Sequence, residues 1–197
     1  MARSLPPAYF DELYGKAADP WKFESSPYES AKFAATLAAL PRARYGPAFE
    51  VGCSIGVLTR ALADRCESVL AVDVAEAALA QARERCRDAA NVRFGRMALP
   101  EEMPDGPFDL VLLSEVAYYW TPDDFDRAFG GLAARLGPGG QWLMVHWIAP
   151  VPDYPQTGEE VHDRAIARAA GSSLVHLDGR REERYRVDLF GRAGPAA

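Results

Sequence analysis

Two glycines and two acidic residues lie where short apolar runs end, and their spacing could hold a ligand. Gly52 and Gly56 let the backbone turn tightly and approach a ligand closely, because glycine tolerates positive φ angles. Glu50 lies inside the apolar run that precedes Gly52. Asp73 follows Gly52 by about 20 positions, which is the spacing of the acidic residue in nucleoside-binding sheets. A carboxylate at Asp73 can accept both ribose hydroxyls of an adenosine-type cofactor. These residues therefore predict a nucleoside site.

Two cofactors compete for such a site. A dinucleotide site expects the pattern GxGxxG, in which glycines approach a pyrophosphate, whereas Ser54 stands here at the position of the middle glycine. A negative charge at Glu50 disfavours a pyrophosphate and favours the sulfonium and ammonium groups of S-adenosylmethionine (SAM). The residues favour SAM, and an NAD-binding oxidoreductase is the alternative.

A second group of candidate residues follows two later apolar runs. Methyl transfer from SAM is an in-line displacement, so the protein must exclude water and align the lone pair of the acceptor. His146 lies near the end of the run 142–147, and histidine ordinarily titrates near neutrality. Glu115 follows the run 108–113, and aromatic residues that could attract a cation come next, including Trp120. The candidate catalytic residues are His146, Glu115, Tyr118 and Tyr119.

Each of these candidates also has a structural alternative. His146 could be a buried strand histidine, Glu115 could cap a turn, and the aromatic residues could belong to the core. Of the other histidines, we expect His162 on the surface of a late helix and His176 in a structural role within a hairpin strand.

The elements that must position these residues alternate between strands and helices. The predicted strands are 48–51, 68–72, 92–94, 108–113 and 142–147. The predicted helices are 27–40, 56–64, 75–87, one that starts after an N-cap at Thr121, and 159–170. Residues 137–140 predict a turn, and the runs 173–177 and 185–190 predict an antiparallel hairpin around the charged residues 178–183.

Repetition of strand and helix implies parallel pairing with right-handed crossovers. The predicted class is therefore α/β: a doubly wound, mostly parallel, seven-stranded Rossmann-like sheet with helices on both faces and a C-terminal antiparallel hairpin.

The motifs, taken in order, resemble those of class I SAM-dependent methyltransferases. Residues 49–56 resemble motif I, 71–73 the ribose-binding strand, 108–116 the fourth-strand motif and 136–140 the loop before strand five. More narrowly, residues 19–21, 26–29, 51–53 and 115–119 look like the NodS family, whose best-known members N-methylate an amino sugar.

This resemblance implies a SAM-dependent methyltransferase (product S-adenosylhomocysteine) that acts on a small-molecule acceptor, foremost an amine nitrogen such as that of an amino sugar. The alternatives are O-methylation of a small natural product and a non-catalytic SAM-binding module.

The resemblance also implies a cofactor site and a lid. The acid that commonly follows strand three is not evident, so we expect Met97 or Ala98 to contact adenine through backbone N–H and packing. We expect residues 1–45 to form a helical lid ahead of a Rossmann-like domain at 46–197, a single domain overall. Trp21 and Tyr28 would cover the methionine moiety, and Lys32 would pair with its carboxylate. The predicted cofactor-binding residues are Trp21, Tyr28, Lys32, Glu50, Gly52, Cys53, Ser54, Gly56, Asp73, Val74, Met97, Ala98, Ser114 and Glu115.

Composition limits the kinds of partner that we expect for this chain. The formal net charge of −6 argues against a nucleic-acid backbone as the main partner, because phosphates need a basic surface. The three cysteines form no CxxC pair, so we expect neither a disulfide framework nor a metal site. No apolar run is long enough to span a bilayer. We expect a cytoplasmic monomer or homodimer with no membrane partner and a frayed tail at residues 194–197.

Overall fold

The computed structural model describes residues 3–194 as two compact units. One holds residues 6–98, and the other holds 99–194 together with 3–5. The expected frayed tail lies outside the described residues from position 195 onward. The division into a lid at 1–45 and a domain at 46–197 stays a prediction.

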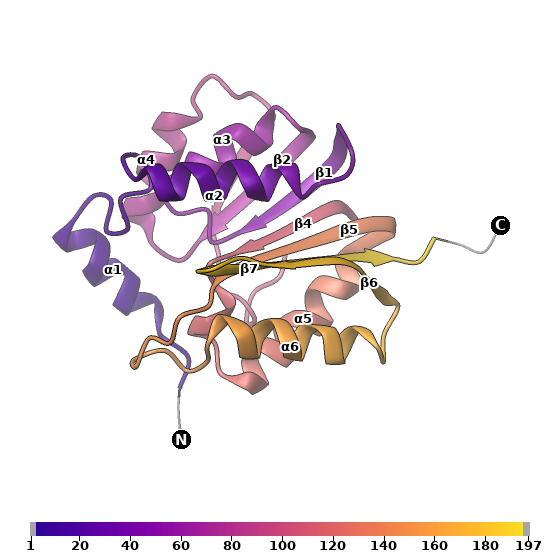
Figure 1. Ribbon diagram of the computed structural model, residues 1–197. Helices are drawn as coiled ribbons and strands as arrows, with labels where there is room; N and C mark the ends of the chain where they lie inside the picture. Colours follow the sequence, from indigo (N-terminus) through magenta and orange to yellow (C-terminus); the bar gives the residue numbers. More distant parts are fainter. Residues whose placement is uncertain (1–2, 195–197) are drawn as a thin grey trace. The chain divides into compact units, whose positions relative to one another are not determined.

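The unit of residues 6–98 alternates between helices and parallel strands. Its elements are α1 (Pro7–Lys16), α2 (Pro27–Ala38), β1 (Tyr45–Val51), α3 (Val57–Ala63), β2 (Cys66–Asp73), α4 (Glu76–Arg85) and β3 (Val92–Arg96). The strands pair in parallel in the order β3-β2-β1. Helices α3 and α4 pack against β2 and against each other (Figure 1). The parallel pairing predicted from the alternation is confirmed.

Local sequence explains where these elements begin. The Ser26 side chain accepts the Glu29 N–H, and Pro27 occupies the first position of α2, where its missing N–H costs nothing. Gly56 precedes α3 with a φ of 78°, and a Cβ there would lie 2.9 Å from the Cα of Ala82 in α4. Glycine therefore permits both the left-handed turn and the close packing of α3 on α4.

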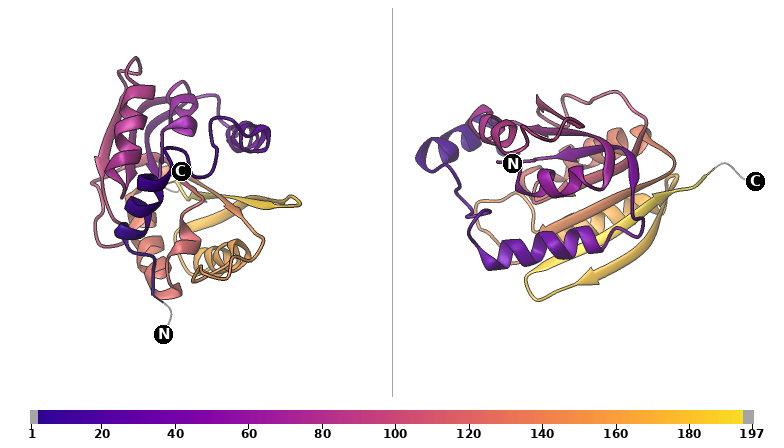
Figure 2. Two further views of the ribbon diagram at one scale, coloured as in Figure 1. Left: turned by 90° about the vertical axis from the view of Figure 1, so that its left-hand side faces the viewer. Right: turned by 90° about the horizontal axis from the view of Figure 1, so that it is seen from above.

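The second unit places a hairpin beside two parallel strands. Its elements are β4 (Phe108–Ser114), the 3₁₀ turn η1 (Ala117–Tyr119), α5 (Pro122–Arg135), β5 (Leu136–Trp147), α6 (Gly158–Ala169), β6 (Leu174–Arg181) and β7 (Tyr185–Arg192). The order is β4-β5-β7-β6, with β4 and β5 parallel and β7 antiparallel to both neighbours. Two views show β6 and β7 as a twisted yellow ribbon (Figure 2).

Side-chain caps and packing position the helices of this unit. Thr121 caps α5 by accepting the Asp124 N–H, as predicted, and Thr157 with Glu160 forms a capping box at α6. Helix α6 packs against β5, β6 and β7. Among residues 3–194 the two units hold seven strands that are mostly parallel and end in an antiparallel hairpin, which confirms the predicted fold class. None of the described helices is long and apolar enough to cross a membrane.

Two local predictions in this unit are corrected. Residues 137–140 lie within β5 instead of forming a separate turn, because the strand absorbs them as an irregularity. Leu136 pairs with Phe108 and Gln141 pairs with Leu110, and Gly139 has a φ of 72°. The charged residues 178–181 continue β6 instead of lying in the loop, since this outer strand leaves their side chains exposed to water.

Candidate cofactor and acceptor sites

The loop after β1 is held by the end of β2. The N–H groups of Gly52 and Cys53 donate to the carbonyl oxygen of Val72 at 2.8 and 2.9 Å. The Ser54 N–H donates to Oδ2 of Asp73 at 2.9 Å, and Oδ1 of Asp73 accepts the Ala75 N–H at 3.0 Å. The structure thus brings together the glycine loop and the carboxylate that the sequence singled out.

The backbone of this loop is left-handed at three positions. Gly52, Ser54 and Gly56 have φ angles of 73°, 50° and 78°. A serine in this region costs conformational energy that a glycine does not. Ser54, which stands where the dinucleotide pattern has a glycine, therefore adopts a backbone conformation that glycine tolerates more easily.

Glu50 is a buried carboxylate at the end of β1. Its side chain is 3% exposed, and its Oε2 atom has no hydrogen-bond partner among the described residues. Burial raises the pKa of Glu50 to about 7 and the charge of Asp73 adds to the rise, while the Thr59 hydroxyl opposes it. A buried carboxylate oxygen without a partner is costly, so the ammonium and sulfonium groups of a bound SAM suit this position.

Asp73 is half-buried and Cys53 is buried. Burial raises the pKa of Asp73, although the N–H groups of Ala75 and Ser54 oppose the rise. Burial also raises the pKa of the Cys53 thiol, which remains protonated at neutral pH. Cys53 can therefore line the site by packing and backbone contacts, without acting as a nucleophile.

Helix α1 packs against the glycine loop through Tyr14. The Tyr14 hydroxyl forms a short hydrogen bond with the Ser54 hydroxyl, and the Tyr14 ring packs in a cluster with Ile55 and Ala75. Trp21 contacts Tyr14 edge-on with ring centroids 5.6 Å apart. Sequence reasoning missed Tyr14, although Phe10 and Tyr14 lie one helical turn apart on an apolar face.

Lys32 already has a partner in its own helix. Its ammonium nitrogen lies 2.9 Å from Oε2 of Glu29 and 5.3 Å from the ring centroid of Tyr28. The side chain is buried. The roles expected of Lys32 and Tyr28 toward the methionine moiety stay predictions, and Glu29 competes with a cofactor carboxylate for the lysine.

The residues after β2 and β3 are tied to each other. The Met97 N–H donates to the carbonyl oxygen of Asp73 at 3.1 Å, so this donor is used inside the unit. The Val74 carbonyl accepts from Nε of Arg96 at 2.8 Å. The contacts that we expected between adenine and Met97 or Ala98 stay predictions, and the Met97 N–H is used within the unit.

In the second unit, Glu115 and three tyrosines form a cluster after β4, whose last residue is the predicted site residue Ser114. Glu115 has a φ of 59°, and its Oε2 accepts from the Tyr118 hydroxyl at 2.6 Å and from the Trp147 N–H at 2.9 Å. Tyr154 stacks on Tyr118 and meets Tyr119 edge-on.

Burial raises the pKa of Tyr118 and of Tyr119, and the charge of Glu115 adds to both rises. Both phenols therefore remain protonated at neutral pH. Glu115 presents a carboxylate that accepts hydrogen bonds from the Tyr118 hydroxyl and the Trp147 N–H, and a carboxylate can hold a cation.

His146 lies at the centre of a buried hydrogen-bonded chain. Its Nε2 accepts the Ala117 N–H at 3.1 Å, and its Nδ1 lies 3.0 Å from Nε2 of His162. Nδ1 of His162 lies 2.5 Å from Oδ2 of Asp188, and Nε2 of His176 lies 2.5 Å from Oδ1. The structure therefore brings His146 into a histidine–aspartate network that sequence reasoning missed.

The expected surface position of His162 is wrong. Its side chain is fully buried, because α6 presents this face to β5 and β7. His176 contacts Asp188, and the structural role expected of it stays a prediction. A signal for Asp188 was available, since it lies two residues from Arg186 and from Phe190, and residues at this spacing share one face of a strand.

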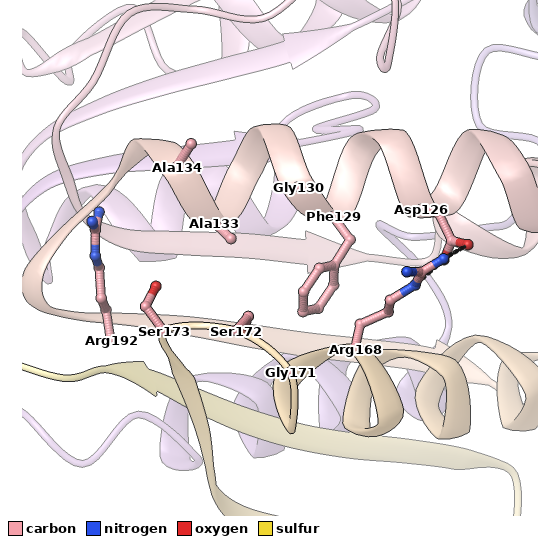
Figure 3. A pocket seen from close by; sticks show the side chains of 10 residues that line it. All are labelled: Asp126, Phe129, Gly130, Ala133, Ala134, Arg168, Gly171, Ser172, Ser173 and Arg192. Atoms are coloured by element: carbon pink, nitrogen blue, oxygen red, sulfur yellow. Dashed lines mark hydrogen bonds and ion pairs between the residues drawn. The ribbon is translucent and has the colours of Figure 1, made fainter.

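A groove in this unit contains none of the predicted site residues. It has a volume of about 370 Å³ and lies along α5 and the ends of α6 and β7 (Figure 3). The Asp126–Arg168 ion pair joins the two helices at one end. Among residues 3–194, no group of three His, Cys, Asp or Glu side chains is placed to hold a metal ion.

Parallel βαβ units, a left-handed glycine loop after β1 and a carboxylate at the end of β2 define a nucleoside-binding protein of the Rossmann-like class. Residues 48–140 match the family described as "Methyltransferase domain". A solved structure from Pseudomonas syringae with a provisional methyltransferase assignment is 36% identical and has a TM-score of 0.72, covering 84% of this chain and 99% of its own. The chain belongs to the methyltransferases and has the fold of the class I SAM-dependent enzymes.

Relatives with a described role include Nodulation protein S of Rhizobium tropici, which is 31% identical over 130 residues, 65% of this chain and 55% of the relative. The chain thus matches little more than half the length of that relative. The structure of N-methyltransferase NodS from Bradyrhizobium japonicum WM9 with S-adenosylhomocysteine is 19% identical, with a TM-score of 0.82 over 96% of this chain and 99% of that one. This second likeness concerns the fold, and SAM is the cofactor of the family.

Proposed function

We propose that this chain transfers the methyl group of SAM to a nitrogen atom of a small amine acceptor. The observation that carries the proposal is the buried Glu50 carboxylate near the left-handed glycine loop: its Oε2 has no hydrogen-bond partner within residues 3–194. A dinucleotide would bring a pyrophosphate to this negative charge, whereas SAM brings two cations. The described activity of the NodS structure, an N-methyltransferase, supports the choice of nitrogen.

The residues of the first unit would hold SAM through contacts of different kinds. Asp73 would accept the ribose hydroxyls, and the backbone of Gly52–Gly56 would follow the methionine moiety. Glu50 would receive the ammonium group. When bound, SAM supplies an electrophilic methyl group on a sulfonium. Packing against the cofactor is proposed for Trp21, Tyr28, Cys53, Val74, Met97, Ala98 and Ser114, with Lys32 near its carboxylate.

The residues of the second unit would prepare the acceptor. An amine must lose its proton before its lone pair can attack, so a carboxylate that takes up this proton assists the reaction. We assign this role to Glu115, with Tyr118 and Tyr119 as aromatic walls that attract a cation. His146 has both ring nitrogens engaged in hydrogen bonds. We therefore propose that it acts by positioning η1, so His146→Ala should lower turnover far more than SAM affinity.

Cofactor binding is tested with an Asp73→Ala variant. We expect calorimetry to show binding of SAM and S-adenosylhomocysteine by the wild type, and a loss of about 100-fold in the variant, because several charge-assisted hydrogen bonds disappear. Asp64→Ala is the matched control, since Asp64 is exposed and pairs with Arg60 on α3. Absence of binding of both nucleosides at high micromolar concentration would refute the proposal, and a fluorescence titration with NADH would detect the oxidoreductase alternative.

The acceptor is tested with methyl-labelled SAM and a panel of amines, phenols and carboxylates. We expect label to enter amines, with amino sugars among the best substrates. Label in phenols alone would make the chain an O-methyltransferase. Binding of SAM without transfer to any acceptor would leave a SAM-binding module.

A further inference from the structure

A continuous chain of hydrogen bonds runs through the second unit and ends at the turn η1. It links the Ala117 backbone amide, His146 in β5, His162 in α6 and Asp188 in β7. The exposed fractions of the residues His146, His162 and Asp188 are 0%, 0% and 1%. Four elements that are separate in the sequence are therefore joined by one polar path in the core.

The direction of every bond in this path is fixed from its two ends. A backbone N–H can only donate, so Nε2 of His146 carries no proton. An ionised carboxylate can only accept, so Nδ1 of His162 carries one. Between them, the Nδ1–H group of His146 donates to the unprotonated Nε2 of His162. Each ring holds one proton, and both histidines are neutral.

The charge balance around Asp188 keeps that end ionised. Burial alone would raise its pKa, but the hydrogen bond from His162 and the charge of Arg186 hold the pKa below its ordinary value. Nε of Arg186 lies 2.8 Å from Oδ2. Burial lowers the pKa of His162, against the pull of Asp188, which favours the neutral ring.

The other end of the path reaches the cluster to which acceptor binding was assigned. Ala117 begins η1, and the next residue, Tyr118, donates to Glu115. The Tyr118 ring also meets His146 edge-on at 5.4 Å. A proton moved to Nε2 of His146 would place two donors face to face at the Ala117 amide, which would release the start of η1.

We infer that His162 and Asp188 are positioning residues for the acceptor site: they determine which nitrogen of His146 carries its proton, and they thereby hold η1 and its Tyr118–Glu115 pair in place. The inference rests on the proposed function for the link to the acceptor. Charged and titratable groups that adjoin the path are Glu115, Glu159, Asp163, His176 and Arg186.

Two substitutions at His162 separate the path from mere packing. His162→Phe keeps a ring of similar size but removes the acceptor for Nδ1 of His146. His162→Gln is the conservative rescue, because its side-chain carbonyl can accept from His146 while its amide nitrogen donates to Asp188. Asp126→Asn is the control, since Asp126 forms an ion pair with Arg168 elsewhere in the unit.

The primary measurement is NMR of protein labelled with ¹⁵N in its imidazoles and amides. We expect a bare Nε2 and a protonated Nδ1 for both His146 and His162 in the wild type. Exchange of the Ala117 amide with solvent should be faster by on the order of tenfold in His162→Phe and close to wild type in His162→Gln and Asp126→Asn. A protonated Nε2 on His146, or unchanged exchange in His162→Phe, would overturn the inference.

The kinetic measurement links the path to the reaction. With an amine acceptor, His162→Phe should raise the acceptor KM by about tenfold while the Kd for SAM stays within about twofold, and His162→Gln should restore the KM. An unchanged acceptor KM would overturn the positioning role. If the wild type transfers no methyl group to any acceptor, the proposed function fails, while the NMR result still decides whether the path holds η1. If His162→Phe does not fold, the inference is tested by the ¹⁵N shifts of the imidazole nitrogens in the wild type and by Ala117 amide exchange in His162→Gln.

Discussion

Buried carboxylates behave in opposite ways in the two units of the chain. Oε2 of Glu50 has no partner among the described residues, and Asp73 receives backbone N–H groups. Asp188 is instead surrounded by His162, His176 and Arg186. Burial raises the pKa of Glu50 and Asp73, whereas hydrogen bonds and a cation hold the pKa of Asp188 down in spite of burial.

This difference indicates that the carboxylates of the first unit serve ligand binding, whereas Asp188 of the second unit serves the structure. Among the described residues, the first unit leaves Oε2 of the buried Glu50 without a hydrogen-bond partner, and a cationic ligand would supply one. The second unit compensates its buried charge internally and uses it to fix neighbouring side chains. Substitution of the carboxylates should therefore change stability in opposite directions.

The largest effect is expected for Asp188→Ala. Removal of the carboxylate leaves His162 and Arg186 without their shared acceptor, so the free energy of unfolding should fall by about 4 kcal/mol, the cost of breaking a buried pair from one side. Urea denaturation at pH 7 measures this fall. Asp163→Ala is the control, because Asp163 also pairs with Arg186 but is exposed, and it should cost less than about 1 kcal/mol. A fall of the same small size in both variants would contradict the comparison.

Glu50→Gln should have the opposite sign and a smaller size. The folded pKa of about 7 lies above the ordinary value of 4.5. Stability contributed by the neutral acid is therefore fully present below pH 4.5 and is lost as pH rises through 7. Near pH 8 the charge costs about 3 kcal/mol, and the amide removes this cost. Urea denaturation should show a variant that is more stable than wild type at pH 8 and similar to it near pH 4.5.

The same variant separates stability from ligand binding. Loss of the charge should weaken SAM binding by about tenfold at pH 8, because the ammonium group loses its counter-charge. Calorimetry at pH 8 checks this value. A variant that is less stable than wild type at this pH would show that Glu50 is compensated inside the unit, and the contrast with Asp188 would disappear.

The features that could be predicted from the sequence are those that depend on residues close together in the chain. The loop at Gly52–Gly56 and the start of α2 at Ser26-Pro27 depend on residues that are neighbours in the chain, and both were predicted. His162 lies among Glu159, Glu160, Val161 and Asp163, so its helix reads as polar there. Its burial depends on which face α6 turns toward β5 and β7, and sequence periodicity did not show this.

Contacts between distant residues escaped prediction for a related reason. The partner of Asp188 comes from α6, and the partner of Ser54 comes from α1. Each residue alone has an ordinary interpretation, as a strand carboxylate or a turn serine. The pairing itself requires knowledge of how helices pack, and the glycine-rich residues 137–140 likewise predicted a turn until the pairing of β5 with β4 was known.

The smallest expected effect tests whether α1 belongs to the binding region or merely covers it. Tyr14→Phe removes the hydrogen bond to Ser54 and keeps the ring in its cluster, so the free energy of unfolding should fall by about 1 kcal/mol. Ser54→Gly removes the conformational cost of a positive φ angle, which stabilises the protein by about 1 kcal/mol. It also removes the hydrogen bond to Tyr14, which destabilises the protein by about the same amount. The two effects should nearly cancel when Tyr14 is present. In the Tyr14→Phe background the bond is already absent, so Ser54→Gly should stabilise by about 1 kcal/mol. A double-mutant cycle by urea denaturation measures this coupling, and equal effects of Ser54→Gly in both backgrounds would mean that α1 rests on the loop without fixing its conformation.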